Sequence, residues 1–143
     1  TLSHYKYKEY DFINLAKSYW KNTSEYLEFS YKYHPKLEEL TKRVLIHLNK
    51  DIYPDKDNYT YSNFFVMKTE LWKDYVENWI KPALEFMEND PEYSQDANYL
   101  SGLPPEKLKE LTGLDHYTYH TFVLERLILY FIADKKLKVK SIV

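Results

Sequence analysis

The sequence predicts a mainly α-helical fold with a small β element (α+β), made of six or seven helices and two or three short strands. Several segments space their apolar residues three and four positions apart, which is the period of an amphipathic helix. Residues 59–67 are rich in β-forming residues and are the strongest strand candidate. The chain has only two glycines, Gly102 and Gly113, which argues against an all-β fold with many tight turns.

The first third of the chain is predicted to hold three helices. Residues 1–8 have no helical period and are interpreted as a strand or an arm. The apolar residues from Glu9 to Trp20 follow a helical spacing, and Ser24 is a candidate N-cap for a short second helix. Pro35 suits the first turn of a third helix. The apolar stripe of that third helix consists of Leu37, Leu40, Val44, Leu45 and Leu48.

The most regular helical period follows the strand candidate and a loop over residues 51–58. Thr69 is its expected N-cap, and its apolar stripe runs from Leu71 to Met87. Pro82 lies inside this helix and removes a backbone donor. We therefore expect a kink, or a new helix start, near Asn78 and Trp79.

The last third is predicted to contain a long connection, two helices and a strand. Residues 89–103 are a polar connection, after which Pro104 and Pro105 open a short helix over 106–111. Gly113 is its expected C′ residue, in the left-handed conformation. An apolar helix follows over 117–133, and the alternating residues 138–143 predict an edge strand.

Length, charge and composition limit the class of protein. The 143 residues correspond to one domain (1–143), which we expect to be a fragment of a longer protein because the chain opens at Thr1 without a methionine. A net charge of −2 gives no electrostatic case for nucleic acid or an anionic membrane. The absence of cysteine and of any apolar run of about 18 residues indicates a cytoplasmic protein without a transmembrane segment.

Glu125 and Arg126 are the only charges in the apolar stretch from Tyr117 to Ile132. Burying a charge costs several kcal/mol unless it is paired or hydrogen-bonded. Arg126 and Arg43 are the only arginines, so this position favours the planar fork of donors that lysine lacks. Adjacent helical residues point about 100° apart, so we expect each charge to have its own partner. Either both serve a site, with Glu125 as a general base and Arg126 as a phosphate or carboxylate clamp, or both anchor neighbouring loops.

Other polar patterns are less specific. Asn63 precedes the apolar run of the strand candidate and could offer a donor and an acceptor to a ligand, or satisfy its own turn. His116 and His120 have the i, i+4 spacing of two metal ligands, but no third ligand has diagnostic spacing, and a histidine that forms a hydrogen bond near a helix start is the favoured interpretation. Asp55 and Asp57 are typical of a solvated turn, so we expect no metal in this chain. Sixteen tyrosines and three tryptophans suit a sugar- or base-stacking surface, or a tyrosine-rich core.

Two of these segments together resemble sugar-nucleotide-dependent glycosyltransferases. Residues 61–88, which read YSNFFVMKTELWKDYVENWIKPALEFME, resemble a strand and helix of that group. Residues 117–131, which read YTYHTFVLERLILYF, resemble a segment of bacterial glycosyltransferase-like proteins of capsule and lipopolysaccharide biosynthesis. The resemblance covers about a third of the chain, mainly residues 59–88 and 115–131.

The resemblance implies a GT-A-like fold in which this chain is the C-terminal, acceptor-side portion. It implies that Asn63, His120 and Arg126 bind substrate and that Glu125 is catalytic, in transfer of a sugar to a glycan hydroxyl. The nucleotide-binding strands and a credible metal-holding Asp-x-Asp are not in this sequence. A divalent metal and a nucleotide sugar would therefore belong to the full-length protein, and this chain alone is expected to be inactive.

The alternative is a non-catalytic helical module whose aromatic surface binds a protein or a glycan. That hypothesis predicts an exposed aromatic patch larger than a few hundred Å², with Glu125 and Arg126 fully satisfied by the protein's own backbone. The donor sugar, the acceptor and the oligomeric state are not specified by the sequence.

Overall fold

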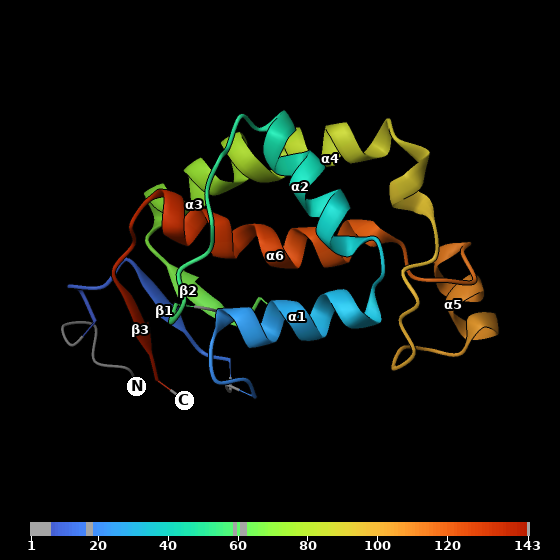
Figure 1. Ribbon diagram of the computed structural model, residues 1–143, viewed down its shortest axis with the longest axis horizontal. Helices are drawn as coiled ribbons and strands as arrows, with labels where there is room; N and C mark the ends of the chain where they lie inside the picture. The colour runs from blue at the N-terminus through green and yellow to red at the C-terminus, as the bar shows by residue number, and fades with distance from the viewer. Residues whose placement is uncertain (1–6, 17–18, 59, 61–62, 143) are drawn as a thin grey trace.

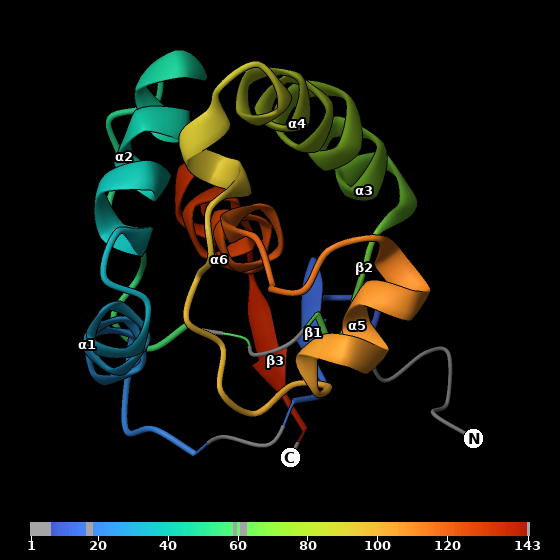
Figure 2. The same cartoon turned by 90° about the vertical axis from the view of Figure 1, so that its right-hand side faces the viewer.

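The apolar helix α6 (Tyr119–Asp134) runs through the middle of the molecule (Figure 1). The computed structural model describes residues 7–16, 19–58, 60 and 63–142. Seen along α6, the helices α1 (Thr23–Tyr33), α2 (Leu37–His47), α3 (Thr69–Tyr75) and α4 (Lys81–Glu88) surround it together with a small sheet (Figure 2). Eleven of its residues are buried, including Arg126. The helix predicted over 117–133 is therefore confirmed as the central element of the fold.

The sheet has three strands in the order β2-β1-β3. The central strand β1 (Phe12–Asn14) pairs antiparallel with β2 (Phe65–Met67), with Ile13 opposite Val66. It pairs in parallel with β3 (Val139–Ser141), with Ile13 opposite Lys140. The C-terminal edge strand predicted over 138–143 is thus confirmed. The strand predicted over 59–67 is confirmed only in its last three residues, and positions 59, 61 and 62 lie outside the described residues.

The helix predicted from Glu9 to Trp20 is wrong, because this segment contains β1. The buried positions are Phe12, Asn14 and Ala16, which follow the period of two of a strand. Asn14 is polar but satisfied, because its side-chain oxygen accepts hydrogen bonds from the Ala16 amide (2.9 Å) and the Thr60 hydroxyl (3.1 Å). The strand or arm predicted over 1–8 lies mostly outside the described residues.

The helices α1 and α2 follow β1 along the chain, and α2 is inclined to α1 (Figure 1). The N-cap of α1 is Asn22 rather than the predicted Ser24, and its side chain accepts a hydrogen bond from the Glu25 amide (3.0 Å). The predicted apolar stripe of α2 is buried from Leu37 to Leu45, while Leu48 lies one residue beyond the helix and is partly buried.

The helix predicted to follow an N-cap at Thr69 begins one residue earlier, because Lys68 is the N-cap and Thr69 is the first helical residue. Between α3 and α4 the backbone is π-helical over η1 (Val76–Ile80), the place where a kink or restart was predicted. Pro82 has no amide hydrogen to donate, and the wider turn preceding it is a common way to accommodate such a gap. Because α3, η1 and α4 are continuous, the described residues form five helices, fewer than the six or seven predicted.

The connection from Asn89 to Leu103 contains the 3-10 helix η2 (Pro91–Ser94), and it leads to α5 (Pro105–Thr112). Gly113 ends α5 in the left-handed conformation (φ 81°), as predicted. Ala97 donates its amide hydrogen to the Tyr117 carbonyl (2.9 Å), so the connection is pinned beside the start of α6. This contact places the 89–103 connection at the N-terminal end of α6.

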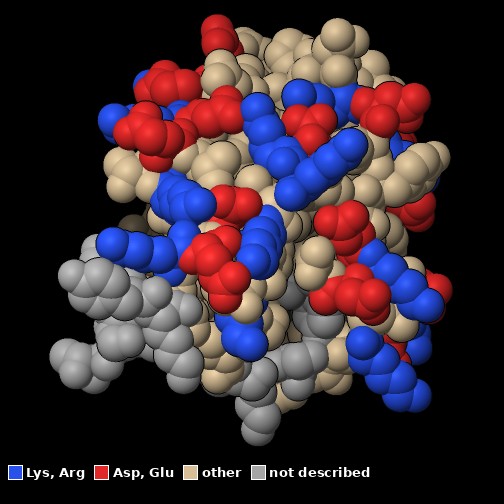
Figure 3. All heavy atoms as spheres, turned by 90° about the vertical axis from the view of Figure 1, so that its left-hand side faces the viewer, with Lys and Arg blue, Asp and Glu red and all other residues tan. Residues whose placement is uncertain are grey.

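One cluster of buried apolar residues joins the sheet to the helices. It includes Phe12 of β1, Leu40 of α2, Trp79 of η1 and Phe131 of α6. On the face at the sheet end of the molecule, basic and acidic side chains are interspersed (Figure 3). In the described part of the chain, no helix is long and apolar enough to cross a membrane.

Candidate functional site

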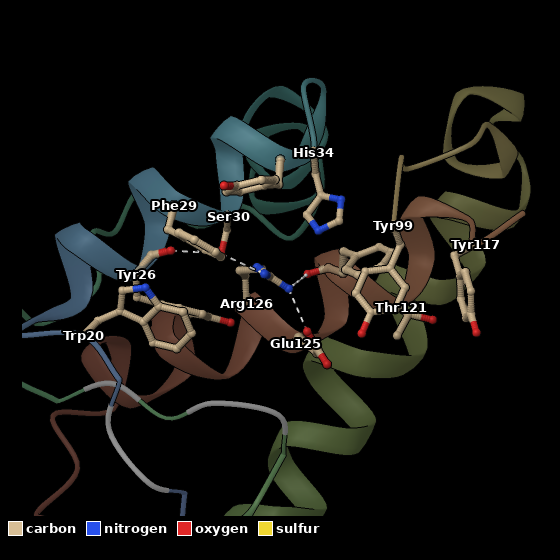
Figure 4. A pocket seen from close by; sticks show the side chains of 12 residues that line it. Trp20, Tyr26, Phe29, Ser30, His34, Tyr99, Tyr117, Thr121, Glu125 and Arg126 are labelled. Atoms are coloured by element: carbon tan, nitrogen blue, oxygen red, sulfur yellow. Dashed lines mark hydrogen bonds and ion pairs between the residues drawn. The ribbon is translucent and has the colours of Figure 1, made fainter. Parts of the chain in front are cut away.

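A cleft lies between α1 and α6 and is closed at one end by Tyr99 of the 89–103 connection and by Tyr117, which lies just before α6 (Figure 4). Its volume is about 220 Å³. Aromatic rings form most of its walls, and the ion pair of Glu125 and Arg126 lies between them. The lining residues are Trp20, Tyr26, Phe29, Ser30, Tyr33, His34, Tyr99, Tyr117, Thr121, Phe122, Glu125 and Arg126.

Arg126 lies at the base of this cleft and is only 4% exposed. Its Nη1 donates to the Phe122 carbonyl (3.0 Å) and to Glu125 Oε2 (2.8 Å), and its Nη2 donates to the Ser30 hydroxyl (2.8 Å). The direct pair with Glu125 corrects the prediction that each charge needs a separate partner. A side chain with four rotatable bonds can bend back along the helix to its neighbour.

The guanidinium of Arg126 is also held between two aromatic rings. Its Cζ lies 5.3 Å from the centre of the Tyr26 ring and 6.0 Å from that of Phe122. Such cation–π contacts contribute about 1–2 kcal/mol at desolvated sites. Arg126 Nε is buried and has no hydrogen-bond partner among the described residues. Three of its five N–H donors are used within the protein and its side chain is only 5% exposed, so little of Arg126 is accessible to a ligand phosphate or carboxylate.

α1 contributes a buried stripe to the cleft with a spacing of four residues: Tyr26, Ser30 and His34. The Ser30 hydroxyl donates to the Tyr26 carbonyl (2.9 Å) while it accepts from Arg126. Ser30 therefore connects the two helices across the cleft. Serine bonds of this kind to the carbonyl four residues earlier are common where a helix buries a hydroxyl.

His34 ends α1 and joins it to the connection. Its Nδ1 donates to the Ala97 carbonyl, and its ring lies 4.1 Å from the Phe122 ring between centroids. Burial lowers the pKa of His34 below its usual 6.5, and the hydrogen bond to Ala97 opposes this effect. The neutral ring with its hydrogen on Nδ1 leaves Nε2 as an acceptor.

Two aromatic walls face each other across the polar groups. Tyr99 and Tyr117 form one wall, with ring centroids 5.1 Å apart, and Trp20 and Phe29 on the α1 side form the other, 5.5 Å apart. Gly102 permits the position of Tyr117, because a Cβ at residue 102 would lie 2.2 Å from the Tyr117 ring. The Tyr117 hydroxyl in turn accepts a hydrogen bond from the Leu103 amide (2.9 Å).

Glu125 is the charged group of the cleft that is more accessible to a ligand. Its side chain is 21% exposed, whereas that of Arg126 is 5% exposed. Oε2 accepts from Arg126, and no hydrogen bond from the described residues reaches Oε1. The carboxylate is thus held in place by the guanidinium while one oxygen remains an open acceptor.

The other two predicted site residues lie elsewhere. Asn63 is exposed in a turn with φ 55°, and it lines a separate apolar pocket of about 540 Å³ together with Met67, Trp72 and Leu124. Leu124 and Glu125 are neighbours on α6, so the two pockets lie on different faces of that helix. His120 does not line the α1–α6 cleft. Its Nδ1 lies 3.1 Å from the Thr118 hydroxyl.

The two histidines have different hydrogen-bond partners. His116 contacts Asp115 through Nδ1 and the Ser94 carbonyl through Nε2, both at 2.9 Å, so it shares no partner with His120. Among the described residues, no group of three or more His, Asp or Glu side chains is arranged to hold a metal ion.

Ser30, His34, Tyr99 and Tyr117 also line the cleft and were not predicted as site residues. A signal was present for the first two, because Tyr26, Ser30 and His34 repeat every four residues and therefore lie on one face of α1. Tyr99 belongs to the 89–103 connection, whose path depends on tertiary contacts, and Tyr117 lies between α5 and α6.

Comparisons of this chain with family models, with curated proteins and with solved structures found no match.

Proposed function

We propose that this chain is a glycan-binding module that holds one sugar ring in the cleft between α1 and α6. The observation that supports the proposal is the position of Glu125 between two aromatic walls. A sugar ring has apolar faces, which pack on aromatic rings, and a rim of hydroxyl groups, which form directed hydrogen bonds. The cleft offers both kinds of surface at once.

The size of the cleft limits the ligand. Sites for drug-sized ligands have volumes of about 300–1,000 Å³, and this cleft has about 220 Å³. That space suits a single ring better than a nucleotide sugar. The proposal therefore assigns the chain to recognition of a glycan rather than of a nucleotide donor.

The open polar groups distinguish a glycan from a proline-rich peptide, which also binds to aromatic grooves. A carboxylate oxygen only accepts hydrogen bonds, so a ligand group that meets Glu125 Oε1 has to donate. Sugar hydroxyls donate readily, whereas proline has no N–H. The partly exposed carboxylate of Glu125 thus favours the sugar.

Saturation-transfer NMR with a panel of methyl glycosides (glucose, galactose, mannose, rhamnose and N-acetylglucosamine) tests the proposal. At least one glycoside should bind. Its affinity should fall about tenfold in Glu125→Gln, because a hydrogen bond to a charged group is lost. Glu28→Gln is the matched control, since Glu28 is exposed on α1 and does not line the cleft. Tyr99→Leu is a second variant that leaves the buried ion pair intact.

Two results would contradict the proposal. One is the absence of saturation transfer to every glycoside at millimolar concentration. The other is binding that is unchanged in both Glu125→Gln and Tyr99→Leu.

A second candidate function is the acceptor side of a bacterial, cytoplasmic glycosyltransferase-like protein with a GT-A-like fold. It is favoured by the half-buried carboxylate of Glu125, which would meet the acceptor hydroxyl and take its proton. In this proposal Arg126 positions Glu125. The nucleotide sugar and a divalent metal would be bound outside this chain. Asn63 and His120 have no role at the cleft.

The reading frame upstream of Thr1 tests this second candidate. It should encode alternating strands and helices with an Asp-x-Asp motif at a strand end. An upstream frame without such a unit contradicts transfer chemistry and leaves glycan binding as the proposal.

A further inference from the structure

The cleft holds one ring, but the aromatic surface around it extends further. On the α1 side, Phe29 is 48% exposed and Tyr33 is 46% exposed. They lie at i and i+4 on α1, and their ring centroids are 4.6 Å apart. On the opposite wall Tyr99 is 41% exposed. Large aromatic rings so exposed and so close together are uncommon on a surface with no binding role.

The rings follow one another in a row. Trp20 lies 5.5 Å from Phe29, which lies 4.6 Å from Tyr33. Figure 4 shows Trp20 and Phe29 on the side of the cleft opposite Tyr99 and Tyr117, with the pair of Glu125 and Arg126 between the two sides. The polar groups are therefore confined to one part of an aromatic surface that extends along α1.

We propose that the ligand is an oligosaccharide, with one sugar residue at Glu125 and the adjoining residues stacked along Phe29 and Tyr33. This inference rests on the proposed glycan-binding function and names its substrate class. The residue in the cleft is recognised by hydrogen bonds. Its neighbours bind by apolar contact alone, which tolerates differences among their hydroxyl groups.

Calorimetric titration with increasing chain length tests the inference. The probes are the methyl glycoside that binds best and the linear di-, tri- and tetrasaccharides of the same sugar. In the wild-type chain, affinity should rise about tenfold from the monosaccharide to the trisaccharide, because further aromatic contacts are made.

The double variant Phe29→Ala/Tyr33→Ala should bind the trisaccharide no tighter than the monosaccharide, although both affinities fall because Phe29 and Tyr33 also line the cleft. The matched control is Tyr53→Ala, which removes an aromatic ring that is 83% exposed and does not line the cleft. In this control the affinity should rise with the length of the saccharide as it does in the wild-type chain.

The outcomes separate the two proposals. If the monosaccharide binds but longer chains bind no tighter, the inference is overturned and the single-ring function stands. If no saccharide of any length binds, the proposed function itself fails. A proline-rich peptide that binds and depends on Phe29 and Tyr33, where saccharides do not bind, would overturn both.

Discussion

At the scale of single residues, the fold and the cleft depend on the same buried cation. Arg126 joins α6 to α1 through Ser30, fixes Glu125 and packs between Tyr26 and Phe122. Only a planar side chain with several donors makes all these contacts together. The sequence pointed to this residue correctly, because a lone arginine in an apolar stretch requires buried partners.

Arg126→Lys should lower the free energy of unfolding by about 2–4 kcal/mol, because lysine retains the buried charge but loses the fork of hydrogen bonds. Urea denaturation followed by circular dichroism measures this change. The matched control is Arg43→Lys at the only other arginine, whose partly exposed pairs with Asp90 and Glu92 a lysine can keep in part, so the loss should be less than about 1 kcal/mol. Equal effects in the two variants would contradict a central structural role for Arg126.

His34 should make stability depend on pH. Burial lowers its pKa in the folded state below 6.5, and nearby Arg126 acts in the same direction while Glu125 opposes it. Above pH 6.5 the ring is neutral in both states, so its contribution to stability is complete. Below pH 6.5 the unfolded chain binds a proton that the folded chain does not, and stability falls until the pH reaches the folded pKa.

The difference between wild type and His34→Asn in urea titrations from pH 7.5 to 5 measures this contribution. Asparagine keeps a donor toward the Ala97 carbonyl but does not titrate. Hydrogen bonds to Ser94 and Asp115 raise the pKa of His116, so this residue makes stability increase as the pH falls, which is opposite to the effect of His34. His116 is present in both proteins. If the free energy of unfolding depends on pH in the same way in both proteins, His34 is not the cause of the pH dependence.

At the scale of elements, prediction succeeded where a segment's own residues decide its structure. α2 and α6 have long, regular apolar periods, and Gly113 adopts the left-handed conformation that few other residues tolerate. β1 failed because three residues are too few to separate helix from strand by period. Its buried Asn14 is satisfied by Thr60, which is distant in sequence and gives no local signal.

The N-cap of α1 is Asn22 rather than the predicted Ser24, and two variants test this difference. Asn22→Ala should cost about 1 kcal/mol, because the Glu25 amide loses its acceptor. Ser24→Ala, at the position predicted from sequence, should change stability by no more than a few tenths of a kcal/mol. Thermal unfolding of the two variants compares them directly. A larger loss for Ser24→Ala would restore the original prediction.

At the scale of the whole molecule, the two chain ends are brought together at one sheet. β1 lies between β2 and β3, so a strand near the N-terminus is completed by the last residues of the chain. Phe12 of that strand belongs to the same apolar cluster as Leu40 and Phe131. Neither the sheet nor the helices therefore buries its apolar face without the other.

We expect the sheet and the helices to unfold as one cooperative unit, because they share this core. Native-state hydrogen exchange should give the most protected amides of β1 and α6 the same free energy of opening, equal to the value from urea denaturation. Trp79 is 1% exposed and lies 5.5 Å from Phe131, so its fluorescence should change in the same transition. The variant Trp20→Phe/Trp72→Phe leaves it as the only tryptophan. Amides of β1 that open at a much lower free energy than those of α6 would show that the sheet is a separate unit, contrary to the single domain predicted from the sequence.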